Sequence, residues 1–254
     1  MTTASGDVLA GATVLVTGAA GGIGREVCAA LQAAGAAVVA ADLHAGGLAE
    51  TWRTIPLDVT DDAAVDAAVT GLGPLDGLVL CHGVTALGPA TDQPMAAVDR
   101  VLDVNLRGSI LVTQAALPGL LQREGRIAVL SSVSGFAPLV HRTAYAASKH
   151  GLHGYFESLR VELAGTGVSV TMVAPSFVAT GIEERAAHRA EGPGGRWSTT
   201  GEVGSPADVA AAVVTGMTRR SRLVLPSRTA RSSYLVSRLA PRVYERVMRR
   251  RVLG

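Results

Sequence analysis

Short aliphatic and β-branched runs alternate with longer alanine-rich segments over most of this 254-residue chain. The short runs hold about four to seven residues between glycine or polar residues, which is typical of strands buried on both faces of a parallel sheet. The longer segments have the length and composition of helices. We predict strands at residues 12–17, 37–42, 54–58, 78–81, 126–132 and 168–173, and helices at residues 25–34, 62–69, 91–105, 106–122 and 143–164.

This alternation determines the fold class. Strands that are each followed by a helix pair in parallel, and right-handed crossovers place helices on both faces of the sheet. With 48% hydrophobic residues, the chain can bury one substantial core. We therefore predict a single-domain α/β fold, a doubly wound parallel sheet with its ligand crevice at the carboxyl ends of the strands. Gly24, Asp42, Asp58, Ser132 and Pro175 lie at or just beyond such ends and so belong to one site.

A glycine-rich turn joins the first predicted strand to the first helix. Its sequence, T-G-A-A-G-G-I-G at residues 17–24, leaves backbone N–H groups free at a helix N-terminus, which is a binding site for a diphosphate. Gly18 permits the tight turn, and Gly22 and Gly24 allow close approach of the phosphates and of helix to strand. Because the chain has 30 glycines, an ordinary glycine turn is the alternative. Together with the predicted sheet, the motif indicates a Rossmann-type dinucleotide-binding fold.

The second predicted strand ends at Asp42, eighteen residues after Gly24. A carboxylate at this strand tip accepts hydrogen bonds from an adenosine ribose and repels a 2′-phosphate. No lysine or arginine stands at residues 43–46, and we expect Arg25 to face away on its helix. The sequence therefore predicts NAD in preference to NADP. The alternative is that Asp42 only caps a turn.

Tyr145 and Lys149 lie four residues apart in an alanine-rich run, so a helix places both side chains on one face. A phenol that exchanges protons near neutral pH needs its pKa of about 10 lowered, and an ammonium one turn away has this effect. Lys149 is the one lysine among 23 lysine and arginine residues, and its compact charge differs from the planar fork of arginine. A chance lysine is the alternative. Ser132 ends a predicted strand, where its hydroxyl can bind a substrate oxygen beside the phenol.

Together these motifs resemble the short-chain dehydrogenase/reductase family in its compact form, over nearly the whole chain to about residue 225. The glycine turn, in which Ile23 takes part, is similar to the family's cofactor loop, T-G-x-x-x-G-x-G. The D-V-N-L segment is similar to the one that carries the family's catalytic asparagine. The resemblance implies a catalytic tetrad of Asn105, Ser132, Tyr145 and Lys149. It also implies that Asp58, Val59, Gly83, Val178 and Thr180, with Tyr145 and Lys149, bind the cofactor.

The resemblance implies an oxidoreductase that transfers a hydride between a nicotinamide cofactor and a carbinol or carbonyl carbon. In this mechanism Ser132 positions the substrate oxygen, and Tyr145 donates or accepts its proton. Lys149 lowers the pKa of Tyr145 and binds the nicotinamide ribose. Asn105 holds a water that links the lysine to solvent.

Two positions depart from the family's usual pattern. His82 stands in L-C-H-G, where the family usually has N-N-A-G, and we interpret it as a strand-end residue rather than a catalytic one. Ser176 follows Pro175 where the family has glycine, so the local turn is expected to differ.

Two further features concern the substrate. Residues 181–204 are polar and glycine-rich, and the resemblance implies a mobile lid that defines the substrate, with Trp197 as an apolar contact. We expect His141, four residues before Tyr145, to border the pocket with Ser132 and Tyr145. A surface position for His141 is the alternative.

The C-terminal segment is basic and amphipathic. Residues 219–254 carry eleven arginines and one acidic residue, Glu245, while the rest of the chain is acidic overall. We predict a catalytic Rossmann-type domain at residues 1–225 and a helical extension at residues 226–254, which Pro241 breaks or restarts. The extension either docks on the body or a neighbouring subunit, or makes a peripheral contact with an anionic membrane.

Composition limits the remaining function classes. Cys28 and Cys81 have neither metal-ligand spacing nor a disulfide framework, so we expect no metal and a reducing compartment. No signal peptide precedes the first strand, and no apolar run reaches the ~18 residues of a membrane span, so the sequence predicts a cytoplasmic protein. The acidic body argues against nucleic-acid binding.

The sequence thus predicts an NAD-dependent alcohol dehydrogenase or ketoreductase. Its expected substrate is a mostly apolar secondary alcohol or ketone of steroid, terpene, acyl or aryl type, and a homo-oligomer, tetramer or dimer, is expected. An epimerase or dehydratase with the same tyrosine–lysine pair is one alternative, against which the chain length and the glycine loop argue. A catalytically silent, dinucleotide-sensing scaffold is the other, against which the complete tetrad argues.

Overall fold

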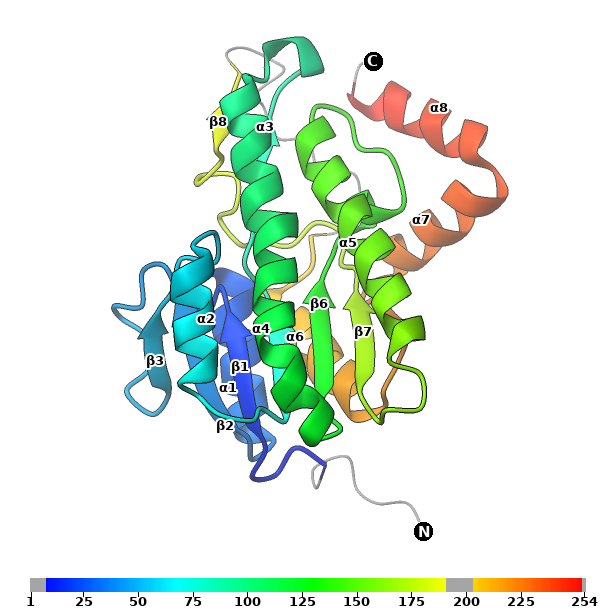
Figure 1. Ribbon diagram of the computed structural model, residues 1–254. Helices are drawn as coiled ribbons and strands as arrows, with labels where there is room; N and C mark the ends of the chain where they lie inside the picture. Colours follow the sequence, from blue (N-terminus) through cyan, green and yellow to red (C-terminus); the bar gives the residue numbers. More distant parts are fainter. Residues whose placement is uncertain (1–7, 191–202, 253–254) are drawn as a thin grey trace.

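The computed structural model describes residues 8–190 and 203–252, which form a three-layered α/β unit around a central sheet (Figure 1). The sheet has seven strands in the order β3-β2-β1-β4-β6-β7-β9, and each neighbouring pair is parallel. The chain order runs outward from β1 in both directions, as in a doubly wound sheet. The strands are β1 (Thr13–Thr17), β2 (Ala37–Asp42), β3 (Arg53–Pro56), β4 (Gly77–Leu80), β6 (Arg126–Leu130), β7 (Ser169–Val173) and β9 (Leu223–Val224).

Helices cover both faces of this sheet, which confirms the predicted fold class (Figure 1). Two helices pack together on one face, and three lie on the other. The first pair is α1 (Gly22–Ala33) and α6 (Pro206–Thr218), and the second set is α2 (Asp62–Thr70), α4 (Gly108–Gln122) and α5 (Thr143–Glu162).

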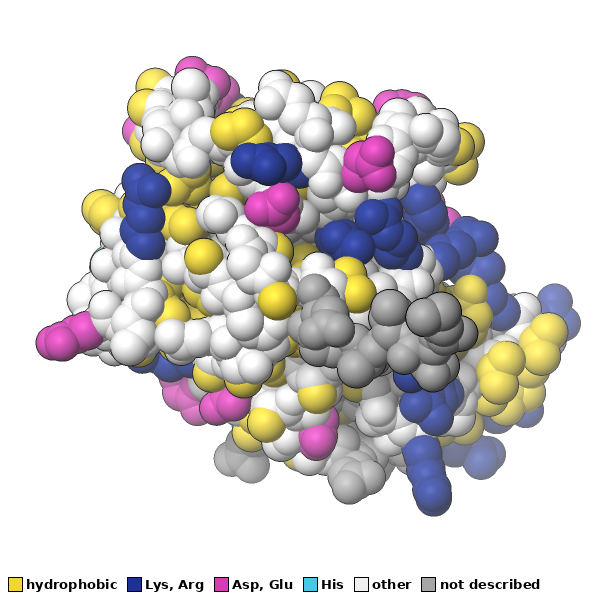
Figure 2. Space-filling model, turned by 90° about the horizontal axis from the view of Figure 1, so that it is seen from below, with side chains coloured by type: hydrophobic (Ala, Val, Ile, Leu, Met, Phe, Trp, Pro, Cys, Tyr) yellow, Lys and Arg dark blue, Asp and Glu magenta, His cyan; other side chains and the backbone are white. Residues whose placement is uncertain are grey.

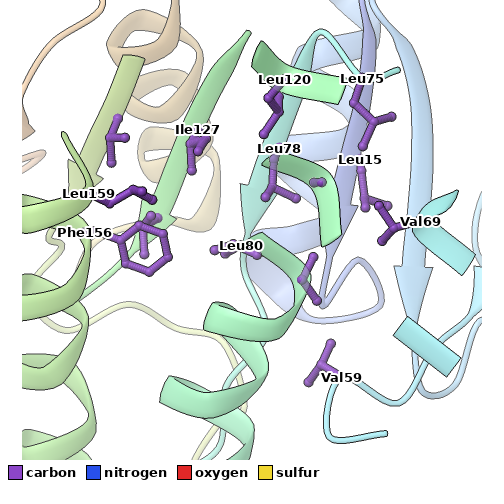
Figure 3. Close-up of a cluster of buried hydrophobic side chains, with 14 of the residues drawn as sticks. Leu15, Val59, Val69, Leu75, Leu78, Leu80, Leu120, Ile127, Phe156 and Leu159 are labelled. Atoms are coloured by element: carbon purple, nitrogen blue, oxygen red, sulfur yellow. The ribbon is translucent and has the colours of Figure 1, made fainter. Parts of the chain in front are cut away.

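Successive strand residues enter opposite core layers, because side chains alternate between the two faces of a sheet. Val14 and Val16 of β1 pack in the layer with α1 and α6, whereas Leu15 packs in the layer with α2, α4 and α5. Figure 3 shows this second layer, in which Leu120 and Phe156 are fully buried. The two aliphatic layers thus hold the strands in place. They also hold the carboxyl ends of the strands, where the site lies.

The two helices predicted between residues 91 and 122 form one nearly continuous helical segment. A 3-10 turn, η1 (Ala90–Asp92), comes first, and α3 (Met95–Leu102) begins only after Pro94. The predicted start at residue 91 is therefore wrong, since the extended backbone of Pro94 separates the two helical turns. The predicted boundary near residue 105 is a π-helical turn, η2 (Asp103–Arg107), which leads directly into α4. Such π turns occur often at functional sites.

A second, two-stranded sheet lies above the carboxyl ends of the main one. β5 (Ala86–Leu87) pairs in parallel with β8 (His188–Arg189), and this joins the chain after β7 to the chain after β4. Val178 forms a further bridge with Gly204. The segment predicted as a lid is therefore held by backbone pairing in its described part.

The C-terminal helices form a hairpin beside the main body (Figure 1). α7 (Arg228–Leu239) ends just before Pro241, at which α8 (Pro241–Val252) begins, so the predicted break at this proline is confirmed. Tyr244 and Met248 of α8 are buried against Ala137. Within the described residues, no helix has the length and apolar character needed to cross a membrane.

Candidate functional site

The carboxyl ends of the strands border a cavity of about 410 Å³. Its wall includes Ser132, Tyr145 and Lys149, three of the four predicted tetrad residues. The fourth, Asn105, is fully buried. Of the residues predicted to bind the cofactor, Ile23, Gly83, Val178 and Thr180 also line this cavity.

Lys149 is positioned by the first turns of α5. The helix begins at Thr143, so Tyr145 and Lys149 lie one turn apart on one face. The ammonium group donates to the carbonyl oxygen of Leu130, at the end of β6, over 2.7 Å, and lies 5.6 Å from the centre of the Tyr145 ring. Burial lowers the pKa of Lys149 from 10.5 to about 8. This lysine can therefore change its charge near neutral pH.

The groups around Tyr145 shift the pKa of its phenol in opposite directions. Burial raises the pKa of its phenol above the ordinary value, while the Arg142 guanidinium and a hydrogen bond with Ser132 lower it, and Glu183 raises it. Arg142 is therefore a cation that lowers this pKa and that we did not expect, while the lowering by Lys149 stays a prediction. The Ser132 hydroxyl also accepts the N–H of Ser134 over 3.1 Å, which holds it at the end of β6.

Arg142 and Glu183 form an ion pair in the cavity wall. Arg142 immediately precedes α5, and Glu183 follows β7. Nη2 of Arg142 lies 3.1 Å from Oε1 of Glu183. Their side chains are only 8% and 12% exposed, respectively. Neither residue was predicted from the sequence. The arginine within H-R-T-A-Y and the acidic pair at the start of a polar segment give no local signal that they meet.

Asn105 fixes the loop that follows β4. Its Oδ1 accepts the N–H of Val84 over 2.8 Å, and its Nδ2 donates to the carbonyl oxygen of Val84 over 2.9 Å and to Oγ of Ser148 over 3.0 Å. Ser148 lies next to Lys149 on α5, so Asn105 joins the loop after β4 to α5. The π turn places it there. The water-holding role implied by the resemblance stays a prediction.

His82 is half-buried and bridges three elements. Its Nδ1 lies 2.6 Å from Oγ1 of Thr17 at the end of β1, and its Nε2 lies 3.0 Å from Oγ of Ser109 on α4. Ser109 donates its own proton to the carbonyl oxygen of Asn105 over 2.8 Å, so it accepts from Nε2–H and leaves Nδ1 to accept from Thr17. Burial lowers the pKa of His82 to about 3. The ring is therefore neutral and stands as a structural cross-link.

The glycine loop fits a dinucleotide diphosphate. Gly18 has a φ of +68°, and a Cβ atom on Gly24 would lie 2.1 Å from the carbonyl oxygen of Gly18. Any side chain there would separate the loop from the helix. The first bond into α1 is donated by Arg25 N–H to the carbonyl oxygen of Gly21, so the amides of Gly22, Ile23 and Gly24 are available at the helix N-terminus. Gly22 lies close to Thr180, which brings the loop after β7 against this cradle.

Asp42 lies at the tip of β2 and binds the glycine loop. Its Oδ2 accepts the N–H of Ala20 over 2.9 Å, and its Oδ1 accepts the N–H of His44 over 3.0 Å. Arg25 does not face away, and that prediction is wrong. Its guanidinium donates to the carbonyl oxygens of Ala20 and Gly47 over 3.1 and 2.8 Å, because the turn after β2 returns to α1. A cation thus binds the same loop residue, Ala20, as the predicted ribose carboxylate.

Asp58 and Val59 follow β3 on the same side of the sheet. The hydroxyl and the N–H of Thr60 bind Oδ1 of Asp58 over 2.7 and 2.9 Å and hold the pKa of this carboxylate below its ordinary value. Val59 is buried against Gly108 of α4. The adenine-binding role that the resemblance implies for both residues stays a prediction.

The predicted substrate residues are only partly brought together. Ser132 and Tyr145 line the cavity, but at the expected position of His141 the wall is formed by Arg142. His141 has a φ of +62°, and its carbonyl oxygen accepts the N–H of Gly88 in the loop after β5. This turned backbone brings the following residue to the cavity. Trp197 lies outside the described residues.

The C-terminal hairpin completes the cavity wall, which the sequence analysis did not predict. Both of its helices contribute, and most of the contributed side chains from α8 are apolar. These wall residues are Thr229, Ser232, Ser233, Val236, Val243, Tyr244, Val247 and Met248.

Comparison with known proteins identifies the family. Residues 12–191 match the model of the short chain dehydrogenase family. A dehydrogenase/reductase SDR family protein 7-like from Anopheles gambiae is 31% identical over 96% of this chain and 84% of its own. The chain therefore belongs to the short-chain dehydrogenase/reductase family of oxidoreductases, which bind a nicotinamide dinucleotide and act on small molecules.

Other relatives extend this similarity. A 2-dehydro-3-deoxy-L-rhamnonate dehydrogenase (NAD(+)) from Sphingomonas sp. (strain SKA58) is 38% identical over 66% of this chain and 72% of its own. A short-chain dehydrogenase structure from Streptomyces avermitilis, 26% identical, covers 94% of this chain and 98% of its own with a TM-score of 0.80. A structure of a short chain dehydrogenase from Burkholderia cenocepacia J2315 in complex with NADP shares the fold, with a TM-score of 0.83 at 20% identity and coverage of 94% and 98%.

Proposed function

We propose that this protein is an NAD-dependent alcohol dehydrogenase or ketoreductase whose substrate is a mostly apolar secondary alcohol or ketone. The observation that carries the proposal is the common wall shared by Ser132, Tyr145 and Lys149, next to the glycine loop. Aliphatic side chains of the C-terminal hairpin, such as Val236 and Val247, also line this cavity. Such a cavity favours a steroid, terpene, acyl or aryl skeleton over a strongly hydrated one.

In the proposed mechanism the chain supplies orientation and proton transfer. Ser132 donates a hydrogen bond to the substrate oxygen, and the Tyr145 hydroxyl gives that oxygen a proton during reduction or takes it during oxidation. Lys149 stabilises the phenolate form of Tyr145 when that form appears, because its ammonium lies beside the ring. When bound, the nicotinamide cofactor supplies or accepts the hydride at the substrate carbon that bears this oxygen.

The proposal names NAD because of Asp42, which presents a carboxylate at the tip of β2. The Sphingomonas relative, an NAD(+) dehydrogenase, supports this choice. Arg25 binds the same loop residue as this carboxylate, but its guanidinium is engaged with the carbonyl oxygens of Ala20 and Gly47. The homo-oligomeric state and the cytoplasmic location stay predictions, and light scattering of the purified chain tests the first.

The experiment is a screen of steroid, terpene, long-chain and aryl alcohols with NAD⁺ and with NADP⁺, in which reduced cofactor is measured by absorbance. Tyr145→Phe should lower the turnover of any substrate found by about 10²-fold or more, the usual contribution of a general acid–base group. Tyr155→Phe, the same change farther along α5, is the matched control and should retain activity. Equal activity of wild type and Tyr145→Phe would refute the proposed chemistry.

A further inference from the structure

The outer side of the C-terminal hairpin carries a row of exposed aliphatic side chains. Leu235 and Leu239 of α7 are 56% and 82% exposed, and Val243 and Val247 of α8 are 48% and 41% exposed. Within each helix the two residues are four positions apart and so share one face. We call these four residues the aliphatic row.

The aliphatic row is continuous with the cavity. Val243 and Val247 are both exposed and part of the cavity wall, so they form its rim. One position further along, Tyr244 and Met248 are buried against the body and also line the cavity. The hairpin therefore has an inner face that is docked and an outer row that remains uncovered.

Arginines surround this row. Among the described residues of the hairpin, seven arginines are exposed, and the one acidic side chain is Glu245, which is also exposed. Figure 2 shows hydrophobic and basic side chains next to one another at the edge of the molecule formed by the hairpin. The exposed arginines are Arg228, Arg231, Arg238, Arg242, Arg246, Arg249 and Arg250.

We propose that the hairpin docks on an anionic lipid surface, with the aliphatic row in the acyl-chain boundary and the arginines on lipid phosphates. Interfacial helices combine these two features, a row of apolar side chains and a dense positive charge. Each helix has 12 residues, which suits helices lying along the membrane surface. The cavity rim then opens toward the bilayer. This last point rests on the proposed function, because it gives an apolar alcohol or ketone a direct path from lipid to Tyr145.

The charge argues against a second copy of the chain as the occupant. A two-fold contact places the same patch on both sides of the interface, so the seven exposed arginines would face seven others. Like charges at such distances repel. A phosphate-bearing surface neutralises them instead.

The experiment uses the full chain and vesicles of phosphatidylcholine, with or without a quarter of phosphatidylglycerol, at low salt. The wild type should sediment with the anionic vesicles at least about tenfold more strongly than with the neutral ones, and added salt should release it. Leu235→Ser with Leu239→Ser should abolish this binding, since neither residue lines the cavity but both belong to the row. Val161→Ser, which changes a 75% exposed residue on α5, is the matched control and should bind like wild type.

A second pair of variants tests the charge. Arg246→Gln with Arg249→Gln should weaken binding to anionic vesicles several-fold, whereas Arg53→Gln, at the opposite edge of the sheet on β3, should not. Thermal unfolding of each variant shows that the fold is retained. Absence of vesicle binding by the wild type would overturn the proposal. The proposal would also be overturned if the wild type formed a dimer and the leucine variants dissociated that dimer without weakening vesicle binding. Vesicle binding is measured without a turnover assay. If the proposed chemistry fails, the binding results therefore still test the lipid proposal.

Discussion

Arg25 and Asp42 bind the same residue of the glycine loop from two sides. Nε of Arg25 donates to the carbonyl oxygen of Ala20 over 3.1 Å, and Oδ2 of Asp42 accepts the N–H of Ala20 over 2.9 Å. The carboxylate that would exclude a 2′-phosphate therefore has a guanidinium near it. That guanidinium is already engaged with Ala20 and Gly47, so it does not freely compensate a phosphate.

We expect the wild type to prefer NAD over NADP by at least about tenfold in kcat/KM, because a phosphate beside Asp42 is repelled by a few kcal/mol in partly screened surroundings. Asp42→Ala should reduce this ratio, mainly by improving NADP affinity. Arg25→Ala should lower the remaining NADP activity further and affect NAD less. The measurement is kcat/KM for both cofactors with one substrate, and Arg53→Ala is the control arginine change. Equal or better use of NADP by the wild type would show that this interpretation of Asp42 is wrong.

The sheet and most helices could be predicted because their signals are local. Strands such as β1 and β7 are short runs rich in β-branched residues, and the break at Pro241 follows from the missing N–H of proline. β5 and β8 have two residues each, too few to show any periodicity. Their pairing depends on tertiary placement, which no local pattern contains.

The candidate site divides in the same way. Tyr145 and Lys149 could be placed together because one helix carries both. The direction of Arg25 depends on the backbone of Gly47, and the Arg142–Glu183 pair joins residues 41 positions apart. The hairpin was predicted to be amphipathic, but that its inner face closes the cavity follows only from where α8 docks.

Lys149 should give the protein a measurable pH dependence of stability. Below pH 8 the folded and unfolded states both hold the proton, and the folded state bears the cost of burying an ammonium. Between pH 8 and 10.5 the folded state loses the proton first, so the unfolded state binds more protons and stability rises with pH. Lys149→Met removes this contribution.

Urea unfolding of wild type and Lys149→Met at pH 7.5, 9 and 10 measures the effect. The free energy of unfolding of the wild type should rise relative to that of the variant as pH increases, by roughly 1–3 kcal/mol in all. A constant difference would mean that the buried lysine keeps its ordinary pKa. Lys149→Arg should retain the fold less well and lose turnover, because a planar fork does not replace a compact ammonium between Leu130 and Tyr145.

His82 should make the fold sensitive to acid. Its pKa is about 3 in the folded protein and 6.5 ordinarily. Between pH 3 and pH 6.5 the imidazole is therefore protonated in the unfolded state but not in the folded state. Stability therefore falls as pH falls through this range. From pH 7 to pH 5 the wild type should lose about 2 kcal/mol more than His82→Asn, which replaces the imidazole with a side chain that does not titrate. Urea unfolding at both pH values checks this, with His150→Asn, an exposed histidine of α5, as the control. Equal acid losses in wild type and His82→Asn would contradict the cross-link.

The Arg142–Glu183 pair should set the pH at which Tyr145 becomes active. Arg142 lowers and Glu183 raises the pKa of the phenol, and the two are joined across the cavity wall over 3.1 Å. Glu183→Gln leaves the positive charge of Arg142 unopposed, so the acidic limb of kcat/KM for alcohol oxidation should move to lower pH. Arg142→Met should move the same limb to higher pH. We expect shifts of roughly half a unit to one unit in each direction.

Stability measurements separate this role from simple bracing. Each single variant leaves one mostly buried charge without its partner and should cost about 3 kcal/mol, and the double variant Arg142→Met with Glu183→Met should recover much of that loss. If the pair only braces the wall, the single variants lose stability while their pH profiles stay at the wild-type position. Opposite displacements of the two profiles, with the double variant near the wild type, would assign the pair to the chemistry of Tyr145. Displacements of the same sign would exclude an electrostatic effect, because the two residues carry opposite charges.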